Sequence, residues 1–274
     1  MVIKSVVLCT VLLLTVFSAA QQSAAPAYQG NVVDGIAFPG QTWTSAGNLS
    51  PIEHNNVYVQ SYIEQDATLF ATFSGSTTLT PYVSLGLMFD TQGYDWNNKV
   101  EPRVGMKLNR VFRKGIVSLG SAYCYEDRFQ SIQSSGLIVY VQDWFGWQPA
   151  TEKASRFPGT SWAAVGNISP VEHGNIIGEG YVSQGVIAKR VRGAAIVPYA
   201  DLTFSRDTKG FDWDNKAILG GGVKAIIPRS QFYTEVGAAY LNEHRFQTNH
   251  SAGGLTLFTN FSFDWSLLNR KGGR

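Results

Sequence analysis

Apolar and polar side chains alternate with a period of two over long stretches of this chain, and this alternation limits the fold more than any other sequence feature. In residues 254–265, leucine, phenylalanine and tryptophan recur at alternate positions, with mostly polar side chains between them. Segments 83–89 and 117–128 repeat the pattern. Because successive side chains of a β-strand point to opposite faces, we expect each segment to form a strand with one apolar face.

Ten such segments are predicted, and connections rich in Gly, Asn, Asp, Ser and Pro separate them. In order they are 57–73, 82–91, 100–112, 115–129, 136–147, 176–191, 196–208, 217–227, 231–246 and 254–265. Several are about nine to eleven residues long, the length at which a tilted strand crosses a bilayer. We therefore predict an all-β protein, an antiparallel β-barrel of about 10–12 strands built from two internal repeats.

The repeats are visible as two closely similar sequences. "FPGQTWTSAGNLSPIEHNN" from Phe38 recurs as "FPGTSWAAVGNISPVEHGN" from Phe157. "DTQGYDWNNK" at residues 90–99 recurs as "DTKGFDWDNK" at 207–216. The repeating unit, about 120 residues long, is too long for one turn of a solenoid or one propeller blade. The same comparison aligns the Asp-Trp pair at 143–144 with the pair at 264–265.

The chain begins with a pattern typical of a cleaved secretory signal. Lys4 precedes an apolar run, and three small residues follow that run at 18–20. Cys124 is then the only cysteine of the mature chain, so an exported protein lacks an internal disulfide. The predicted organisation is a signal peptide (1–20), an N-terminal extension (21–37), a first half-barrel (38–147), a linker (148–156), a second half-barrel (157–265) and a tail (266–274).

Two architectures are compatible with this alternation, and they differ in what the apolar face of the sheet contacts. In a soluble sandwich this face packs against a second sheet, whereas in an outer-membrane barrel it contacts lipid. We favour the barrel because aromatic residues such as Trp96, Trp144 and Trp213 fall at strand ends, where interfacial girdles lie. The predicted location is the bacterial outer membrane, with lipid as partner. The alternative is a secreted or periplasmic pair of β-domains that binds carbohydrate.

Composition and motifs exclude several functions. The net charge is +2, only 15% of residues are charged and no basic run occurs, so nucleic-acid binding is not expected. Nucleophile-elbow, zinc-protease and phosphate-loop motifs are missing from the sequence. We therefore predict a protein that is not an enzyme and needs no cofactor or metal.

Ten strands raise a problem of sidedness. Five crossings in each half would place the two decapeptides on opposite sides of the membrane. Two solutions are open: a sixth crossing around Trp43 and Trp162, or a return of the chain through the lumen between 148 and 170.

Charged residues on the polar face are candidates to line the lumen. Glu126 and Arg128 lie two residues apart on one face, and the second half repeats this arrangement. They would line the path of a permeant or form a ladder of ion pairs inside a narrow barrel. The predicted lumen-lining residues are Glu126, Arg128, Asp201, Glu235, Glu243 and Arg245.

The decapeptides combine tryptophan with amide and carboxylate groups, a mixture suited to glycan contact. The favoured interpretation is nevertheless a tight turn at the membrane surface, with glycan contact and an oxygen-rich cation loop as the alternatives. The predicted contact residues are Asp95, Trp96, Asn98, Asp212, Trp213 and Asn215. The Glu-His pairs at 53–54 and 172–173 are interpreted as structural turns.

The alternation, the signal and the aromatic strand ends resemble bacterial outer-membrane β-barrels. "GYDWNNK" followed by a glycine-bearing strand resembles the barrel regions of exopolysaccharide-export and bacteriophage-adsorption outer-membrane proteins. That resemblance implies a surface role connected with polysaccharide. The predicted function is thus a non-enzymatic outer-membrane barrel that acts as a narrow channel, an anchor or a receptor.

Overall fold

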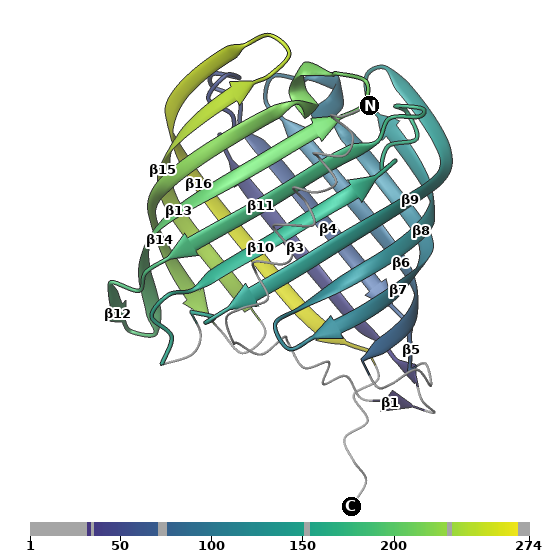
Figure 1. Ribbon diagram of the computed structural model, residues 1–274, viewed down its shortest axis with the longest axis horizontal. Coiled ribbons are helices and arrows are strands. Elements are labelled where there is room, and N and C mark those ends of the chain that lie inside the picture. The colour runs from purple at the N-terminus through teal and green to yellow at the C-terminus, as the bar shows by residue number, and fades with distance from the viewer. Residues whose placement is uncertain (1–31, 34–35, 71–75, 151–153, 229–231, 268–274) are drawn as a thin grey trace, which may run out of the picture.

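The computed structural model describes residues 32–33, 36–70, 76–150, 154–228 and 232–267, which form one sheet closed on itself (Figure 1). The predicted signal peptide and most of the N-terminal extension and the tail lie outside these residues. Among the described residues, no helix is long and apolar enough to cross a membrane.

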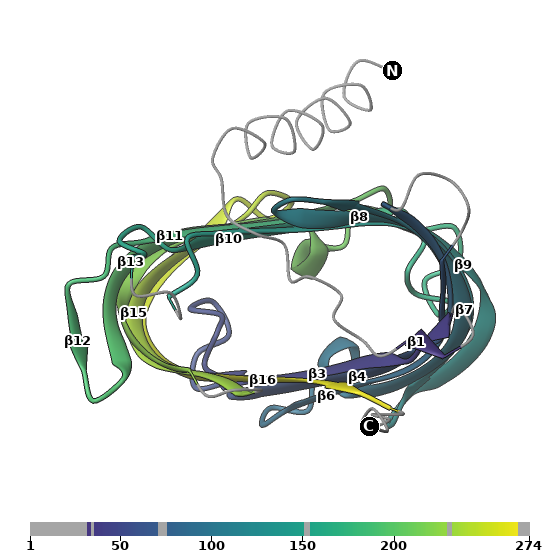
Figure 2. The ribbon, with the colours of Figure 1, turned by 90° about the horizontal axis from the view of Figure 1, so that it is seen from below.

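Twelve antiparallel strands make the wall of the barrel, and each pairs with the next strand along the chain. They are β3 (Pro39–Gly47), β4 (Tyr58–Asp66), β6 (Thr77–Asp90), β7 (Lys99–Phe112), β8 (Gly115–Arg128), β9 (Ile132–Trp147), β10 (Gly159–Gly166), β11 (Ile177–Gly185), β13 (Ala194–Asp207), β14 (Lys216–Pro228), β15 (Phe232–Arg245) and β16 (His250–Ser266). Pairing of β16 with β3 closes the ring. The cross-section is oval (Figure 2).

Short strands and turns lie at the two ends of the wall. They are β1 (Val32–Val33), β2 (Ile36–Ala37), β5 (Thr68–Phe70), β12 (Lys189–Val191) and the 3-10 turns η1 (Asp95–Asn97) and η2 (Asp212–Asp214). We call the end with η1 and η2 the loop end, and the opposite end, where β3 begins and β16 finishes, the terminal end.

The number of crossings resolves the sidedness problem. Trp43 lies in β3 and Trp162 lies in β10, so each half of the chain contributes six wall strands. The predicted count of five crossings in each half is therefore wrong, and the sixth crossing is where the first solution placed it. The alternative return through the lumen is wrong as well, because residues 159–166 pair with β9 and β11 in the wall. Both decapeptides consequently lie at the loop end.

The boundaries of two predicted strands also need correction. The segment 57–73 breaks at residue 67 and the segment 176–191 breaks at 186–188. The parts beyond the breaks, β5 and β12, pair with the beginnings of β6 and β13, and residues 71–73 lie outside the described residues. Alternation persists across such a break, so periodicity alone does not reveal it.

The predicted alignment of Trp144 with Trp265 is wrong at the level of contacts. The Trp265 ring lies over Gly40, and its Nε1 donates to Gln65 Oε1 at 2.9 Å. It is Trp147 that lies over Gly159 and donates to a glutamine at 2.9 Å in the same way. The two Asp-Trp pairs are identical in sequence, but the tryptophan that corresponds to Trp265 is three residues after Trp144, at the end of β9.

The outer face of the barrel is apolar. Leu255, Leu257 and Leu137 are 64–67% exposed, and many other large apolar side chains share this surface. A soluble sandwich would bury these residues, whereas lipid covers them on a membrane barrel. The expected face therefore points outward, and the β-domain alternative lacks a second sheet to cover it.

Polar and small side chains face the lumen and bury one another. Lys107 Nζ contacts Glu64 at 2.8 Å and Asp66 at 3.0 Å, and Tyr140 donates to Tyr82 at 2.7 Å. In the second half, Lys224 pairs with Glu235 at 2.8 Å. Apolar clusters accompany these pairs, one around Ile138 and Cys124 and one around Val197 and Ile226.

Candidate functional site: the loop end of the barrel

The connections 48–57 and 167–176 leave the wall at the loop end and turn into the lumen. Asn48 Oδ1 accepts from the backbone N–H of Leu257 at 2.9 Å, and Asn48 Nδ2 donates to the carbonyl of Leu255 at 3.0 Å. Asn167 makes the same two bonds to β9, at 2.6 and 3.2 Å. Each asparagine side chain thus substitutes for the next backbone pairing of its strand, and the chain beyond it is released to turn inward. Parts of these connections fall within the outline of the barrel in Figure 2.

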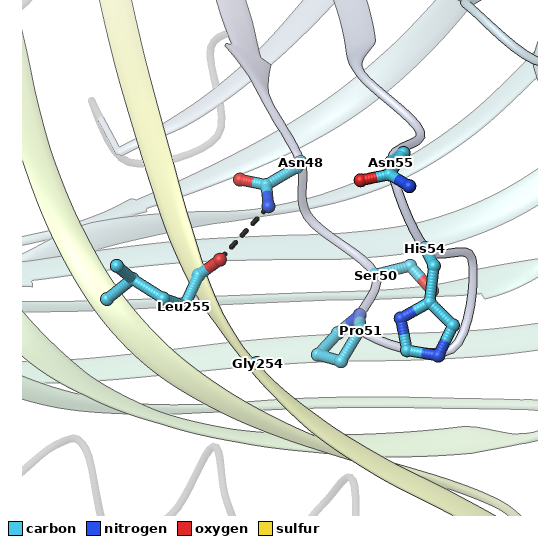
Figure 3. A pocket seen from close by; sticks show the side chains of 7 residues that line it. All are labelled: Asn48, Ser50, Pro51, His54, Asn55, Gly254 and Leu255. Carbon is cyan, nitrogen blue, oxygen red and sulfur yellow. Dashed lines mark hydrogen bonds between the residues drawn. The ribbon is translucent and has the colours of Figure 1, made fainter.

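A shallow pocket marks the place where the first connection leaves the wall. Figure 3 shows the Asn48–Leu255 bond at its edge. The lining residues are Asn48, Ser50, Pro51, His54, Asn55, Gly254 and Leu255. A second hollow lies beside Asn167 at the matching position. Both hollows follow from the inward turn of the chain, and neither gathers a set of catalytic groups.

An ion pair joins the 48–57 connection to β15 in the other half of the chain. Glu53 Oε1 accepts from Arg245 Nη2 at 2.6 Å, and Arg245 Nε donates to Glu243 Oε1 at 3.0 Å. The hydroxyl of Ser50 donates to the second oxygen of Glu243, whose side chain is fully buried. We call Ser50, Glu53, Glu243 and Arg245 the first clasp.

The 167–176 connection makes the corresponding contacts with β8. Glu172 Oε1 accepts from Arg128 Nη2 at 2.6 Å, Arg128 Nε donates to Glu126 Oε1 at 2.8 Å, and Ser169 donates to Glu126. We call Glu126, Arg128, Ser169 and Glu172 the second clasp. Buried charges are tolerated when geometry is good and hydrogen bonds satisfy the remaining atoms, which both clasps achieve.

Asp90 organises the first decapeptide loop. Its Oδ1 accepts from the backbone N–H groups of Gly93 and Tyr94 at 2.6 and 3.1 Å and from Asn98 Nδ2 at 2.8 Å. Gly93 has a φ of 73°, a left-handed conformation that glycine adopts without a steric penalty. Asp207 makes the same contacts in the second loop. These bonds fit the tight-turn interpretation of the decapeptides.

Four aromatic rings from the two decapeptides form one continuous stack. Trp96 and Trp213 lie 4.5 Å apart with an interplanar angle of 3°. Tyr94 covers the other face of Trp96, and Phe211 covers the other face of Trp213, each at 4.9 Å. The expectation that these rings join an interfacial girdle is wrong, because they stack on one another between the two loops. Sequence position fixes the end of the barrel at which a ring lies but not the direction in which it points.

The predicted glycan-contact residues are largely engaged within the loops. Both faces of each tryptophan are covered, and Asn98 and Asn215 are buried and bonded to their own loops. Asp212 accepts from Arg245 at 3.3 Å and from Thr248 at 2.9 Å. Asp95 lies 3.8 Å from Arg128 and accepts from Ser131.

The predicted lumen residues all lie on the inner face. Four of them belong to the clasps, and Glu235 belongs to the Lys224 ion pair. Asp201 accepts from Tyr181 at 3.3 Å. These contacts fit the ladder interpretation, and a role in lining a permeant path stays a prediction.

Three carboxylates lie close together near the second clasp. Atoms of Glu172, Asp207 and Asp214 lie within 4.8 Å of one another. However, Arg128 and Asn175 already occupy the oxygens of Glu172, and backbone and amide donors occupy those of Asp207. Of the three carboxylates, that of Asp214 alone accepts no hydrogen bond, and one carboxylate supplies too few ligands for a cation.

Sequence reasoning missed the roles of Glu53 and Glu172. Both were interpreted as parts of structural turns, which they are, but each is also the carboxylate that receives an arginine from the other half. Each glutamate follows a Ser-Pro pair after one apolar residue, and this repetition was a usable signal, since a buried glutamate needs a cationic partner.

No protein-family model and no curated protein matches the chain. Among solved structures, it is similar to an outer membrane channel from Pseudomonas putida F1 (9% identity, TM-score 0.46, 89% of this chain and 100% of that chain covered). It is also similar to the beta domain of the Bordetella autotransporter BrkA (13%, TM-score 0.39, 84% and 99%). A third similar structure is the translocator domain of the autotransporter NalP from Neisseria meningitidis (12%, TM-score 0.37, 84% and 88%).

The closed ring of twelve strands and its apolar exterior define the class of the protein. Backbone groups in a bilayer must be paired within the protein, and a closed antiparallel sheet achieves this without a free edge. The chain is therefore an outer-membrane β-barrel protein. Its predicted location in the bacterial outer membrane, in contact with lipid, agrees with this class.

Proposed function

We propose that the protein is a non-enzymatic barrel of the bacterial envelope that is closed at its loop end and acts as an anchor or receptor. The observation that carries this proposal is the pair of clasps. Their charged side chains are at most 9% exposed, and in each clasp one ion pair joins one half of the chain to the other. A permeant would have to break two buried ion pairs in order to pass the loop end.

Barrel size explains why the loops turn inward. An interior formed by about eight strands is filled by wall side chains alone, and the lumen widens as strands are added. In a barrel of twelve strands, the inward connections 48–57 and 167–176 supply the missing filling. The ion pairs hold these connections in place.

Planar-bilayer recording tests the proposal. We expect the purified full-length protein to insert without a steady conductance. A variant in which residues 49–55 are replaced by a Gly-Ser linker should conduct, because the first connection then no longer fills the lumen. A stable conductance of the unaltered protein at neutral pH would refute closure.

A narrow channel is the second candidate function, and one group of residues favours it. Lys99, Glu101 and Arg103 face the lumen near the clasps, and their side chains keep 14–20% of their surface exposed. Water and small ions would find charged partners there. If the channel is real, Glu101→Lys should shift its ion selectivity toward anions, whereas an anchor would show no current to alter.

Polysaccharide is the ligand class that we propose for the loop end. The outer faces of Tyr94 and Phe211 end the aromatic stack, and ring faces are the surfaces on which sugars pack. Loss of polysaccharide retention by a Tyr94→Ala, Phe211→Ala double variant would support this role. Equal retention by that variant and the unaltered protein would contradict it.

We also propose that the barrel arose by duplication of a six-stranded unit. The support is the recurrence of contacts. A serine, two glutamates and an arginine form each clasp, and an aspartate organises each decapeptide loop. If this is right, residues 38–147 produced alone should associate in pairs in detergent, and a strictly monomeric fragment would count against it.

A further inference from the structure

The two decapeptide loops differ at one position that faces the clasps. In the first loop this position is Asn97, which is buried. Its Nδ2 donates to Asp90 Oδ2 at 3.0 Å and lies 3.5 Å from Glu53 Oε2. The amide nitrogen has two hydrogens and therefore donates to both neighbouring carboxylates.

In the second loop the same position is Asp214, which has no such hydrogen when it is ionised. Its carboxylate lies within 4.8 Å of those of Glu172 and Asp207, and its buried Oδ2 has no hydrogen-bond partner. Because both neighbours are acceptors, an ionised Asp214 would bring a third negative charge and no donor to this place.

We propose that Asp214 carries a proton when the loop end is closed, and that release of this proton to water loosens the second decapeptide loop. The protonated carboxyl donates to Asp207 or Glu172 as the amide of Asn97 does in the first loop. Ionisation replaces that bond by repulsion among three carboxylates. Glu172 belongs to the second clasp, so the repulsion acts directly on the ion pair that holds the inward connection.

The charges around Asp214 favour the protonated form. Burial raises the pKa of Asp214, and the carboxylates of Glu172 and Asp207 raise it further, to about 7. Lys216 on β14 and Lys99 on β7 lower it. The remaining charged group of η2, Asp212, is paired with Arg245.

The sign of the effect follows from these facts. A carboxyl whose pKa is higher in the closed loop than in an open, hydrated one stabilises closure at low pH. That stabilisation is lost as the pH rises from about 4 toward 7. The inference concerns the closure itself and holds whether the barrel is an anchor, a receptor or a channel.

Hydrogen exchange measured by mass spectrometry on the full-length protein in detergent tests the proposal. The quantity is the protection of residues 208–215 divided by that of residues 91–98 in the same molecule, which cancels the intrinsic pH dependence of exchange. We expect this ratio to fall about tenfold or more between pH 5.5 and 8.5. A chelator keeps divalent cations from replacing the proton.

Two variants make the result decisive. Asp214→Asn should hold the ratio constant across this range, because it installs the amide that the first loop already uses. Asn97→Asp should make residues 91–98 lose protection at high pH in the same way. The four histidines are present in every variant, so their titration is common to all. A constant ratio in the unaltered protein, or an unchanged pH response in Asp214→Asn, would overturn the proposal.

Discussion

Removal of the Arg128 guanidinium should destabilise the barrel more than removal of an exposed arginine. Arg128→Met leaves Glu172, which is 7% exposed, without its cation, and leaves Glu126, which is 0% exposed, with Lys99 alone at 3.7 Å. Breaking a buried ion pair by removing one partner costs about 3–5 kcal/mol. Ser169 still donates to Glu126, so we expect a loss near the lower end, about 3 kcal/mol.

Equilibrium urea unfolding of the protein in detergent micelles measures this loss of free energy. The same curve should be reached by unfolding the folded protein and by refolding the unfolded protein. Arg113→Met is the matched control, because Arg113 is exposed in the turn between β7 and β8. We expect the control to change stability by less than about 0.5 kcal/mol.

A double-mutant cycle then isolates the pair. Glu172→Gln combined with Arg128→Met should lose less than the sum of the single losses, with a coupling of about 1–3 kcal/mol. If Arg128→Met and Arg113→Met lose the same free energy of unfolding, the clasp does not hold the loop end, and the reasoning behind the proposed closure fails.

Four further predictions follow from other contacts. Gly210→Ala should cost about 1 kcal/mol in urea unfolding, since Gly210 has a φ of 79° and a Cβ would lie 3.2 Å from the Gln247 amide; an unchanged midpoint would contradict this. Trp213→Leu should cost about 1–3 kcal/mol, because each face of the ring loses an aromatic partner, and a neutral result would show that the stack is incidental. Leu137→Arg, at a side chain that is 64% exposed, should cost about 2–4 kcal/mol and hinder folding into vesicles, whereas efficient insertion would argue against lipid contact. The stability contributed by the raised pKa of Asp214 should disappear as the pH rises from about 4 to about 7, and Asp214→Asn should flatten that part of the stability profile.

Local pattern made the strands predictable. The alternation in residues 254–265 indicates which side chains face lipid, and the exposed Leu255 and Leu257 agree with it. Glycine and aspartate placed the decapeptides in turns, as the contacts of Asp90 and Gly93 bear out. Such features depend on backbone geometry over a few residues and can therefore be predicted from the sequence.

The candidate site was only partly predictable, because its contacts join residues that are far apart in the sequence. Glu126 and Arg128 are two residues apart, so their shared face could be predicted, but the partner of Arg128 lies 44 residues away on an inward connection. For Arg245 and Glu53 the separation is 192 residues. The local sequence does not indicate which distant carboxylate will pair with an arginine.

The sequence by itself determined the strand character of the segments, which side chains share an apolar face, and the recurrence of its motifs. Tertiary structure alone decided the sixth crossing in each half, the closure of β16 on β3, and the inward turn of the connections 48–57 and 167–176. The physical reason is that side-chain alternation is set by the backbone of one strand, whereas closure depends on the pairing of strands more than 200 residues apart. The stacking of Trp96 on Trp213 belongs to the second kind, because it arises only once the ring of strands has brought both loops to the same end.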